Sequence, residues 1–243
     1  YKTFIHEQNS IPGKSNRFLA KYCDLIGVSF KSSMEYLPKN KTVLTGNPCS
    51  ENALKVPSAT KMSLGLSSNK QLVLVTMGSL GSSSVNKVMM EAMDKFKTKK
   101  YEVLYISGKT LYEKIKDNKF PTNVKVLPFY EGLTGIMKRA DLIVSRAGAS
   151  TLSEIIALEM PSILIPSPYV ANNHQYINAM DLIKERAAIM IEEKDLTSDL
   201  LVKTIDDTLN DVVKLRTLKN NLKNFKVDDS ASMIYNELKE LIK

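Results

Sequence analysis

Short β-branched or apolar runs alternate with segments of helical periodicity between residues 70 and 191. Each run is four to seven residues long, which suits a buried strand and is too short for a helix. The expected strands cover residues 71–77, 101–106, 124–127, 141–145, 162–165 and 188–191. The expected helices between them cover residues 85–96, 110–116, 133–140, 151–158 and 174–186. This alternation predicts an α/β fold in which helices cover one parallel sheet of six strands.

The first 41 residues do not make a second complete domain. They contain two expected strands, at residues 2–5 and 25–30, with a helix at 15–22 between them. Two strands are too few for a stable sheet on their own. We therefore interpret residues 1–42 as the remnant of a further domain.

The two remaining segments complete the predicted organisation. Residues 43–69 are rich in Ser, Asn and Pro, which indicates a linker that holds a helix at most. Residues 230–243 form an amphipathic helix that we expect to pack in the core. Residues 70–243 are thus predicted to be one complete domain with closing helices.

The composition restricts the partners and the compartment. Lys and Arg number 34 against 26 Asp and Glu, a formal net charge of +8, which favours phosphorylated ligands, acidic lipid or nucleic acid. The aromatic residues are not interleaved with Lys and Arg, so we expect no nucleic acid. Two Cys and two His cannot form a zinc cage, and we expect no metal and no cofactor. The lack of a long apolar run or a signal peptide predicts a soluble, cytoplasmic chain.

Three loops that follow predicted strands are expected to share one site. These are residues 78–84, residues 146–150 and the weaker 129–132. The carboxyl ends of parallel strands lie on one edge of a sheet, and helix N-termini there favour phosphate. Ser79 adds a hydroxyl, and Gly148 leaves space for a pyrophosphate. The alternative for the first loop is an ordinary strand-to-helix turn, because neither GxGxxG nor GxxxxGK(S/T) is present.

Glu154 follows the loop of residues 146–150 and has two interpretations. A carboxylate in this position can accept hydrogen bonds from vicinal hydroxyls, as acidic residues do with a ribose. It can equally belong to a capping box with Thr151 or Ser150 in the first turn of the helix. Both interpretations stay open from the residues alone.

Two clusters of polar side chains supply further candidates. His174, Gln175 and Asn178 lie at the start of a predicted helix and suit sugar hydroxyls, although a solvated helix start is the alternative. His6 follows the first strand and can act as a general base oriented by Glu7, because an imidazole has a pKa of about 6.5. A loop histidine that only makes hydrogen bonds is the alternative.

Several segments together resemble one enzyme family. They are, in order, HEQNSIPG at residues 6–13, TGNP at 45–48, Gly78-Ser79, SRAGASTLSE at 145–154 and HQYINA at 174–179. The chain resembles, from residue 4 to residue 193, the MurG family of bacterial N-acetylglucosaminyltransferases, which make lipid II. The resemblance implies a GT-B architecture, with two Rossmann-like domains facing a cleft, of which the first is truncated here.

The resemblance also implies roles for individual residues. Glu154 would hold the uridine ribose, and the backbone around Tyr130 would hold the uracil. The other implied contacts are Ser79, Ala149, Ser150 and Thr151 with the diphosphate, and Asn9, His174 and Gln175 with the sugar. Arg146 and Asn178 lie in the same motifs, and we expect them to support these contacts. The implied reaction transfers N-acetylglucosamine from UDP-N-acetylglucosamine to lipid I with inversion, and helix N-termini rather than a metal stabilise the departing UDP.

The chain departs from the family pattern in three places. Met77 stands where a glycine is usual, Ser50 stands where an arginine is usual, and the opening strand with its glycine-rich loop is missing. Lys55 or Arg146 can replace the missing cation. We therefore expect the fragment to bind the donor only. The alternatives are a non-catalytic nucleotide-sugar module that needs a partner chain, and a GT-B transferase with another lipid acceptor.

The excess of basic residues suggests a function for the first 41 residues, which carry four more Lys and Arg than Asp and Glu. Lys14, Arg17 and Lys21 flank Phe18, Leu19 and Tyr22 on one predicted helix. Such a face suits an anionic inner leaflet, with each cation contributing about 1 kcal/mol. The chain is then peripheral on the cytoplasmic face of the membrane. A helix packed in its domain, with solvated lysines, is the alternative.

Overall fold

The computed structural model describes residues 1–78 and 82–243, and it contains two parallel sheets. The smaller sheet has the order β1-β2-β3, with β1 at Phe4–Glu7, β2 at Leu25–Val28 and β3 at Thr42–Leu44. Ile26 and Val28 are fully buried in its small core. The expectation of two strands was wrong, because β3 adds a third and takes in the first residues of the predicted linker.

The larger sheet has six parallel strands, as predicted, in the order β6-β5-β4-β7-β8-β9. The strands are β4 (Leu72–Thr76), β5 (Glu102–Ile106), β6 (Val124–Leu127), β7 (Leu142–Ser145), β8 (Ser162–Leu164) and β9 (Ile189–Met190). Every residue of β4, β5 and β7 is buried. Apolar side chains therefore cover both faces, which explains why these strands are continuous apolar runs.

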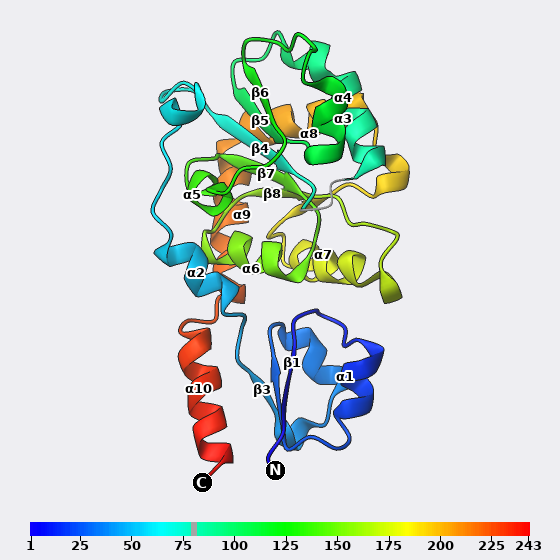
Figure 1. The fold of residues 1–243 in the computed structure, drawn as a ribbon, viewed down its shortest axis with the longest axis vertical. Helices are drawn as coiled ribbons and strands as arrows, with labels where there is room; N and C mark the ends of the chain where they lie inside the picture. The colour runs from blue at the N-terminus through cyan, green and yellow to red at the C-terminus, as the bar shows by residue number, and fades with distance from the viewer. Residues whose placement is uncertain (79–81) are drawn as a thin grey trace.

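Helices pack on both faces of the larger sheet (Figure 1). Val73 and Val75 contact α3 (Ser83–Phe96) and α8 (Ser198–Leu209) on one face. Leu72 and Leu74 point to the other face, which is covered by α5 (Leu133–Met137), α6 (Ala149–Ala157), α7 (His174–Lys184) and the end of α9 (Val212–Leu222). Helix α4 (Lys109–Ile115) buries Ile115 in the first cluster.

The chain that joins the two sheets contains helix α2. Helix α2 (Cys49–Lys55) packs against α6, and Lys138 Nζ donates to the carbonyl of Leu54 at its end. Short 3-10 helices cover Lys31–Tyr36, Lys39–Lys41, Met62–Leu64, Ala171–Asn173, Glu193–Asp195 and Lys223–Phe225. The division at residues 42 and 69 stays a prediction.

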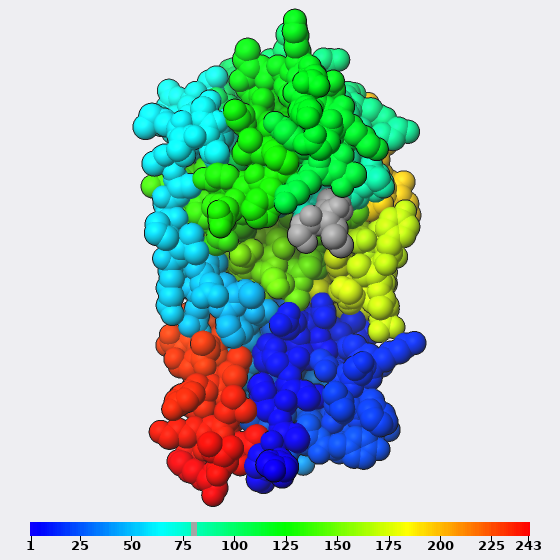
Figure 2. Space-filling view, in the orientation of Figure 1, coloured from blue at the N-terminus to red at the C-terminus, as the bar shows by residue number. Residues whose placement is uncertain are grey.

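The closing helix α10 (Ser230–Leu241) does not pack in the core of the larger domain, so that expectation was wrong. Of its residues only Ser230 is buried, and the helix runs beside the unit that contains the smaller sheet (Figures 1 and 2). The segment before it crosses back between the units and contacts Gly46. A Cβ at Gly46 would lie 2.7 Å from Val227 Cβ, and its φ is +69°, so both space and backbone require glycine there.

Within the residues described, no helix is both long and apolar enough to cross a membrane. Helix α1 (Lys14–Leu19) has no buried residue.

Candidate functional site

The larger sheet has its switch point between β4 and β7. From β4 the chain moves outward through β5 and β6, and then returns to place β7 on the other side of β4. Thr76 pairs with Ser145 at the ends of these two strands. The helices that follow them, α3 and α6, pack on opposite faces of the sheet, which leaves a crevice between the two strand ends. Such a crevice, at the carboxyl edge of the sheet, is where open α/β sheets bind ligands. We call this edge the rim. Ser79 lies outside the described residues.

The N-terminus of α6 faces the rim, and the helix itself offers no acceptor to the backbone N–H groups of its first turn. Gly148 is the N-cap and has no side-chain capping bond, and a Cβ at this position would have nothing within 4 Å. Ala149, Ser150 and Thr151 form the first turn, in which Ser150 is exposed. The N–H groups of this turn have no partner within the helix, and the helix dipole adds positive potential there. This terminus can therefore bind a phosphate oxygen.

Glu154 lies beside the loop that follows β6. Because α6 begins at Ala149, this residue is in the second turn, and the capping-box interpretation was wrong. Thr134 Oγ1 donates a 3.0 Å hydrogen bond to Glu154 Oε1. Burial raises the pKa of the Glu154 carboxyl, and the Thr134 bond opposes that rise. Half-buried Tyr130 stands in the same loop, where its ring fills the space beside Gly132. The structure thus brings Tyr130 and Glu154 to one side of the crevice.

Arg146 is held in a buried network and is not a free cation. Its Nη1 lies 2.6 Å from Glu193 Oε2, and the two side chains are 10% and 8% exposed. Its Nη1 also donates to the Ile165 carbonyl, and Nη2 donates to Ser82 Oγ at 2.6 Å. Arg146 therefore ties the N-cap of α3 to the end of β8.

Arg146 is thus not free to replace the missing arginine, and replacement by Lys55 stays a prediction. Besides Arg146, the other candidate cation was Lys55, which pairs with Glu51 at 3.7 Å. Ser50, at the position of that arginine, donates instead to the carbonyl of Asn47 at 2.7 Å.

Asn178 connects the two sheets at the rim. Its side chain is fully buried, and Oδ1 accepts a 2.8 Å bond from the Ser10 amide. Nδ2 donates to Asn9 Oδ1 and to the Ala147 carbonyl, both at 3.1 Å. Three of the sequence segments singled out above, each far from the others in the chain, therefore meet at one side chain.

His174 and Gln175 begin α7 at the same rim. His174 Nδ1 lies 2.9 Å from the Ala171 carbonyl, and Gln175 Oε1 accepts a 2.9 Å bond from the Ser167 amide. Asn172 and Asn173 precede them with φ values of 55° and 50°, a left-handed turn that Asn tolerates. Gln175 Nε2 has no hydrogen-bond partner in the described part of the chain and can donate to a ligand.

Glu7 does not orient His6, so that expectation was wrong. Neighbouring residues of a strand point to opposite faces. Buried Glu7 instead accepts bonds from the amides of Asn9 and Gly13 and from the side chains of Asn9 and Asn16. His6 Nε2 lies 3.0 Å from the Gly46 carbonyl, and burial lowers its pKa. The catalytic role of both residues stays a prediction.

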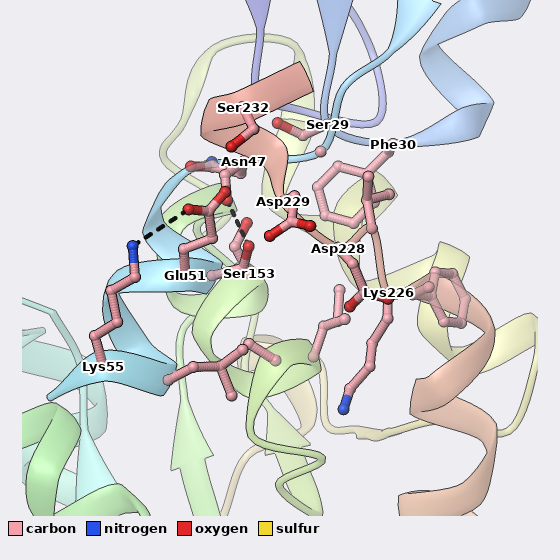
Figure 3. Close-up of a pocket in the computed structure, with 17 residues that line it drawn as sticks. Ser29, Phe30, Asn47, Glu51, Lys55, Ser153, Lys226, Asp228, Asp229 and Ser232 are labelled. Carbon is pink, nitrogen blue, oxygen red and sulfur yellow. Dashed lines mark hydrogen bonds and ion pairs between the residues drawn. The ribbon is translucent and has the colours of Figure 1, made fainter. Parts of the chain in front are cut away.

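Among the described residues there is no cluster of three His, Cys, Asp or Glu side chains that could hold a metal. A cavity of about 540 Å³ lies away from the rim, between the two units (Figure 3). Ser153, Ile156 and Ala157 of α6 line it, and Glu154 does not.

Comparison with known proteins agrees with this geometry. The glycosyltransferase family 28 C-terminal domain matches residues 72–234. The chain is similar to a solved structure of Acinetobacter baumannii MurG, with a TM-score of 0.74 and 22% identity over 98% of this chain and 67% of that one. It is also similar to a structure of S. aureus MnaA with UDP, with a TM-score of 0.69 and 12% identity over 95% of this chain and 63% of that one. Two parallel-sheet units with a crevice at the switch point have the GT-B architecture, and the match to family 28 places the chain among the glycosyltransferases.

Sequence relatives identify the family. The chain is 41% identical to a UDP-N-acetylglucosamine–N-acetylmuramyl-(pentapeptide) pyrophosphoryl-undecaprenol N-acetylglucosamine transferase of Bacillus cereus, over 99% of this chain and 68% of that protein. It is 42% identical, with the same two coverages, to the transferase of that name from Halalkalibacterium halodurans. The chain therefore belongs to the MurG family of glycosyltransferases.

Sequence reasoning missed two partners of predicted site residues. Thr134 is 20 residues from Glu154, and Glu193 is far from Arg146 in the chain. Neither contact has a local signal, because both depend on how the strands are ordered in the sheet.

Proposed function

We propose that the rim binds the donor UDP-N-acetylglucosamine and that the chain supplies the donor half of sugar transfer to an undecaprenyl-pyrophosphoryl-muramyl acceptor. One observation supports this most strongly: the Tyr130 loop, the Glu154 carboxylate and the N-terminus of α6 meet at one crevice. The loop offers backbone groups to uracil, the carboxylate accepts from ribose hydroxyls, and the helix terminus receives the diphosphate. The names of the relatives supply the sugar and the acceptor.

The reaction in this proposal needs a base and a stabilised leaving group. A carbonyl cannot donate, so the contact with Gly46 requires that Nε2 of neutral His6 carries the proton. Nδ1 is then the nitrogen that accepts the proton of the attacking hydroxyl, and the lowered pKa keeps the imidazole neutral at pH 7. The hydroxyl oxygen bonds to the anomeric carbon as the bond to UDP breaks, with inversion. The N–H groups at the start of α6 stabilise the charge that develops on UDP.

Glu7 positions the segment after β1 rather than touching the reacting atoms. Its carboxylate fixes Asn9 through two hydrogen bonds, and Asn9 in turn accepts from Asn178. In this proposal Asn9, His174 and Gln175 border the sugar, and Gln175 Nε2 donates to one of its hydroxyls.

Calorimetric titration tests donor binding and specificity. We expect saturable binding of UDP-N-acetylglucosamine that is tighter than binding of UDP-N-acetylgalactosamine. Gln175→Leu should reduce this preference and leave UDP affinity unchanged, whereas the same substitution at exposed Gln8 should change neither. Failure of both nucleotide sugars to bind, or identical affinities for them in the wild type, would contradict the proposal.

We further propose that helix α1 and the residues after it rest on an anionic membrane surface, at the cytoplasmic face where the lipid acceptor is offered. Phe18, Leu19 and Tyr22 are 60%, 43% and 71% exposed. Phe18 and Tyr22 lie with their rings 5.3 Å apart, and Arg17 stacks 5.2 Å from the ring of Tyr36. An exposed apolar patch with cations at its border suits a membrane interface.

Vesicle co-sedimentation tests the membrane proposal. Binding to phosphatidylglycerol vesicles should exceed binding to phosphatidylcholine vesicles, and Phe18→Ser with Tyr22→Ser should reduce it. Tyr235→Ser, at a residue of α10 that is 64% exposed, is the control and should bind as the wild type does. Unchanged binding by the double variant would remove this surface from the proposal.

A further inference from the structure

Helix α7 makes a second contact with the unit that contains the smaller sheet, which we call the smaller unit. The helix lies on the side of the larger unit that faces the smaller sheet (Figure 1). Asp181 follows Asn178 by three residues, on the same side of α7 and about 4.5 Å further along its axis. Ser32 Oγ, in the 3-10 helix after β2, donates a hydrogen bond to Asp181 Oδ2. Two segments of the smaller unit, one after β1 and one after β2, therefore bind the same helix.

The Ser32 hydroxyl lies near two acceptors, of which the carboxylate is the stronger. Ser32 Oγ is 3.4 Å from the carbonyl oxygen of Ser10, at the limit of a hydrogen bond. A hydroxyl has one proton to donate, and a bond to a charged acceptor is roughly twice as strong as a bond to a neutral one. The Ser10 amide in turn donates to Asn178 Oδ1 at 2.8 Å. Ser10, Ser32, Asn178 and Asp181 thus form one network between the smaller unit and α7.

The place of this network on α7 connects it to the proposed sugar site. Gln175 lies in the first turn of the helix, so a tilt of α7 against the smaller unit moves Gln175 as well. Asn9, on the smaller unit, accepts a 3.1 Å bond from Asn178 Nδ2. A single contact acts as a pivot, whereas two contacts at different points along a helix fix its angle. The bond between Ser32 and Asp181 therefore sets the angle at which the smaller unit meets α7.

The two parts of the donor depend differently on this angle. All the groups proposed to bind UDP, namely the Tyr130 loop, Glu154 and the start of α6, belong to the larger unit. Only the sugar is bordered from both units, by Asn9 on one side and by Gln175 on the other. A change in the angle between the units should therefore alter recognition of the sugar and leave recognition of UDP unchanged.

From these observations we propose that Ser32 and Asp181 are positioning residues for the sugar of the donor. Their hydrogen bond holds the smaller unit against α7, so that Asn9 and Gln175 face each other across the sugar. This role rests on the proposed donor site. The two residues are 149 positions apart, so only the tertiary structure brings them together.

Calorimetric titration of the whole chain with UDP and with UDP-N-acetylglucosamine tests this role. The ratio of the two dissociation constants measures the contribution of the sugar. Asp181→Ala and Ser32→Ala should each lower the affinity for UDP-N-acetylglucosamine relative to UDP about fivefold, which is the effect of losing one hydrogen bond, and leave the UDP affinity unchanged. Asp181→Asn keeps an acceptor oxygen for the hydroxyl and should restore most of the ratio. Glu185→Ala, at the exposed end of α7, is the control and should bind as the wild type does.

Stability and pairing separate this role from a general loss of structure. Ser32 and Asp181 both line a cavity of about 440 Å³ between the units, so water can replace a lost partner there. In Asp181→Ala the hydroxyl also has the Ser10 carbonyl as an acceptor. The melting temperature should therefore change little in each single variant. The double variant Ser32→Ala with Asp181→Ala should lose no more affinity than either single variant, because both substitutions break the same bond.

Amide exchange measured by NMR tests the contact without a ligand. The Ser10 amide, which donates to Asn178, should exchange faster in Asp181→Ala than in the wild type. Failure of the wild type to bind UDP would overturn the proposed donor site and this role with it. Where the wild type binds, four results would each overturn the positioning role alone: an unchanged ratio in the single variants, an equal loss of UDP affinity, additive losses in the double variant, or unchanged exchange of the Ser10 amide.

Discussion

Substitution of Glu154 by Gln separates ligand binding from stability at the proposed donor site. Among the described residues this carboxylate has one hydrogen-bond partner, Thr134, whose hydroxyl donates to Oε1. Gln keeps an oxygen at that position, so the bond to Thr134 is retained. The variant loses the negative charge and one acceptor oxygen, and we propose that this oxygen accepts hydrogen bonds from the ribose hydroxyls.

The two effects of Glu154→Gln should have opposite signs. Burial raises the pKa of this carboxyl, which means that the folded chain binds the proton more tightly than the unfolded chain does. Above the folded pKa the ionised group therefore lowers stability, and the neutral amide removes that effect. At pH 7 the unliganded variant should unfold at the same temperature as the wild type or a higher one.

UDP affinity should fall while stability does not. Loss of hydrogen bonds from ribose hydroxyls to a charged acceptor costs about 1–3 kcal/mol, a decrease in affinity of about 5-fold to 150-fold. Isothermal titration calorimetry with UDP and differential scanning calorimetry measure the two quantities. Glu113→Gln, on exposed surface of α4, is the matched control. Unchanged UDP affinity in Glu154→Gln, or a large loss of stability, would refute the reasoning.

Three further substitutions test contacts of the structure. Arg146→Met leaves the Glu193 carboxylate buried without its partner and should lower the free energy of unfolding in urea by about 3–5 kcal/mol. The double variant Arg146→Met with Glu193→Leu should recover most of that stability. Equal losses in the single and double variants would contradict a buried ion pair. Gly46→Ala should cost about 1–3 kcal/mol because its φ is +69°, whereas Gly13→Ala, where a Cβ meets nothing, should cost little. His6 has a lowered pKa, so its contribution to stability is present above pH ~6.5 and is lost as pH falls through the lowered pKa. Unfolding of His6→Gln should therefore depend less on pH between 7 and 5 than that of the wild type, and a parallel dependence would contradict this.

The larger sheet could be predicted from the sequence because each strand is marked by its own residues. Residues 72–76, 102–106 and 142–145 are buried on both faces, so each strand is a continuous apolar run that stands out against its neighbours. Strand β3 could not be predicted in the same way. It has three residues, it follows a stretch rich in lysine, and its pairing with β2 is set by the sheet rather than by its own composition.

The candidate site was predictable as a set of segments but not as a set of contacts. The rule that parallel strands share a carboxyl edge brought together the loops at residues 146–150 and 129–132. The actual start of α6, two residues earlier than expected, moved Glu154 into the second turn and gave it Thr134 as a partner. Asn178 was singled out for its place in a polar segment, yet its role as the link between the two sheets depends on tertiary structure.

A crystal structure of the chain with UDP-N-acetylglucosamine tests the central claim most directly. We predict that uracil lies against the backbone around Tyr130, that both ribose hydroxyls lie within hydrogen-bond distance of Glu154, and that the diphosphate lies at the first turn of α6. Nucleotide density on a surface remote from the switch point between β4 and β7 would contradict this prediction.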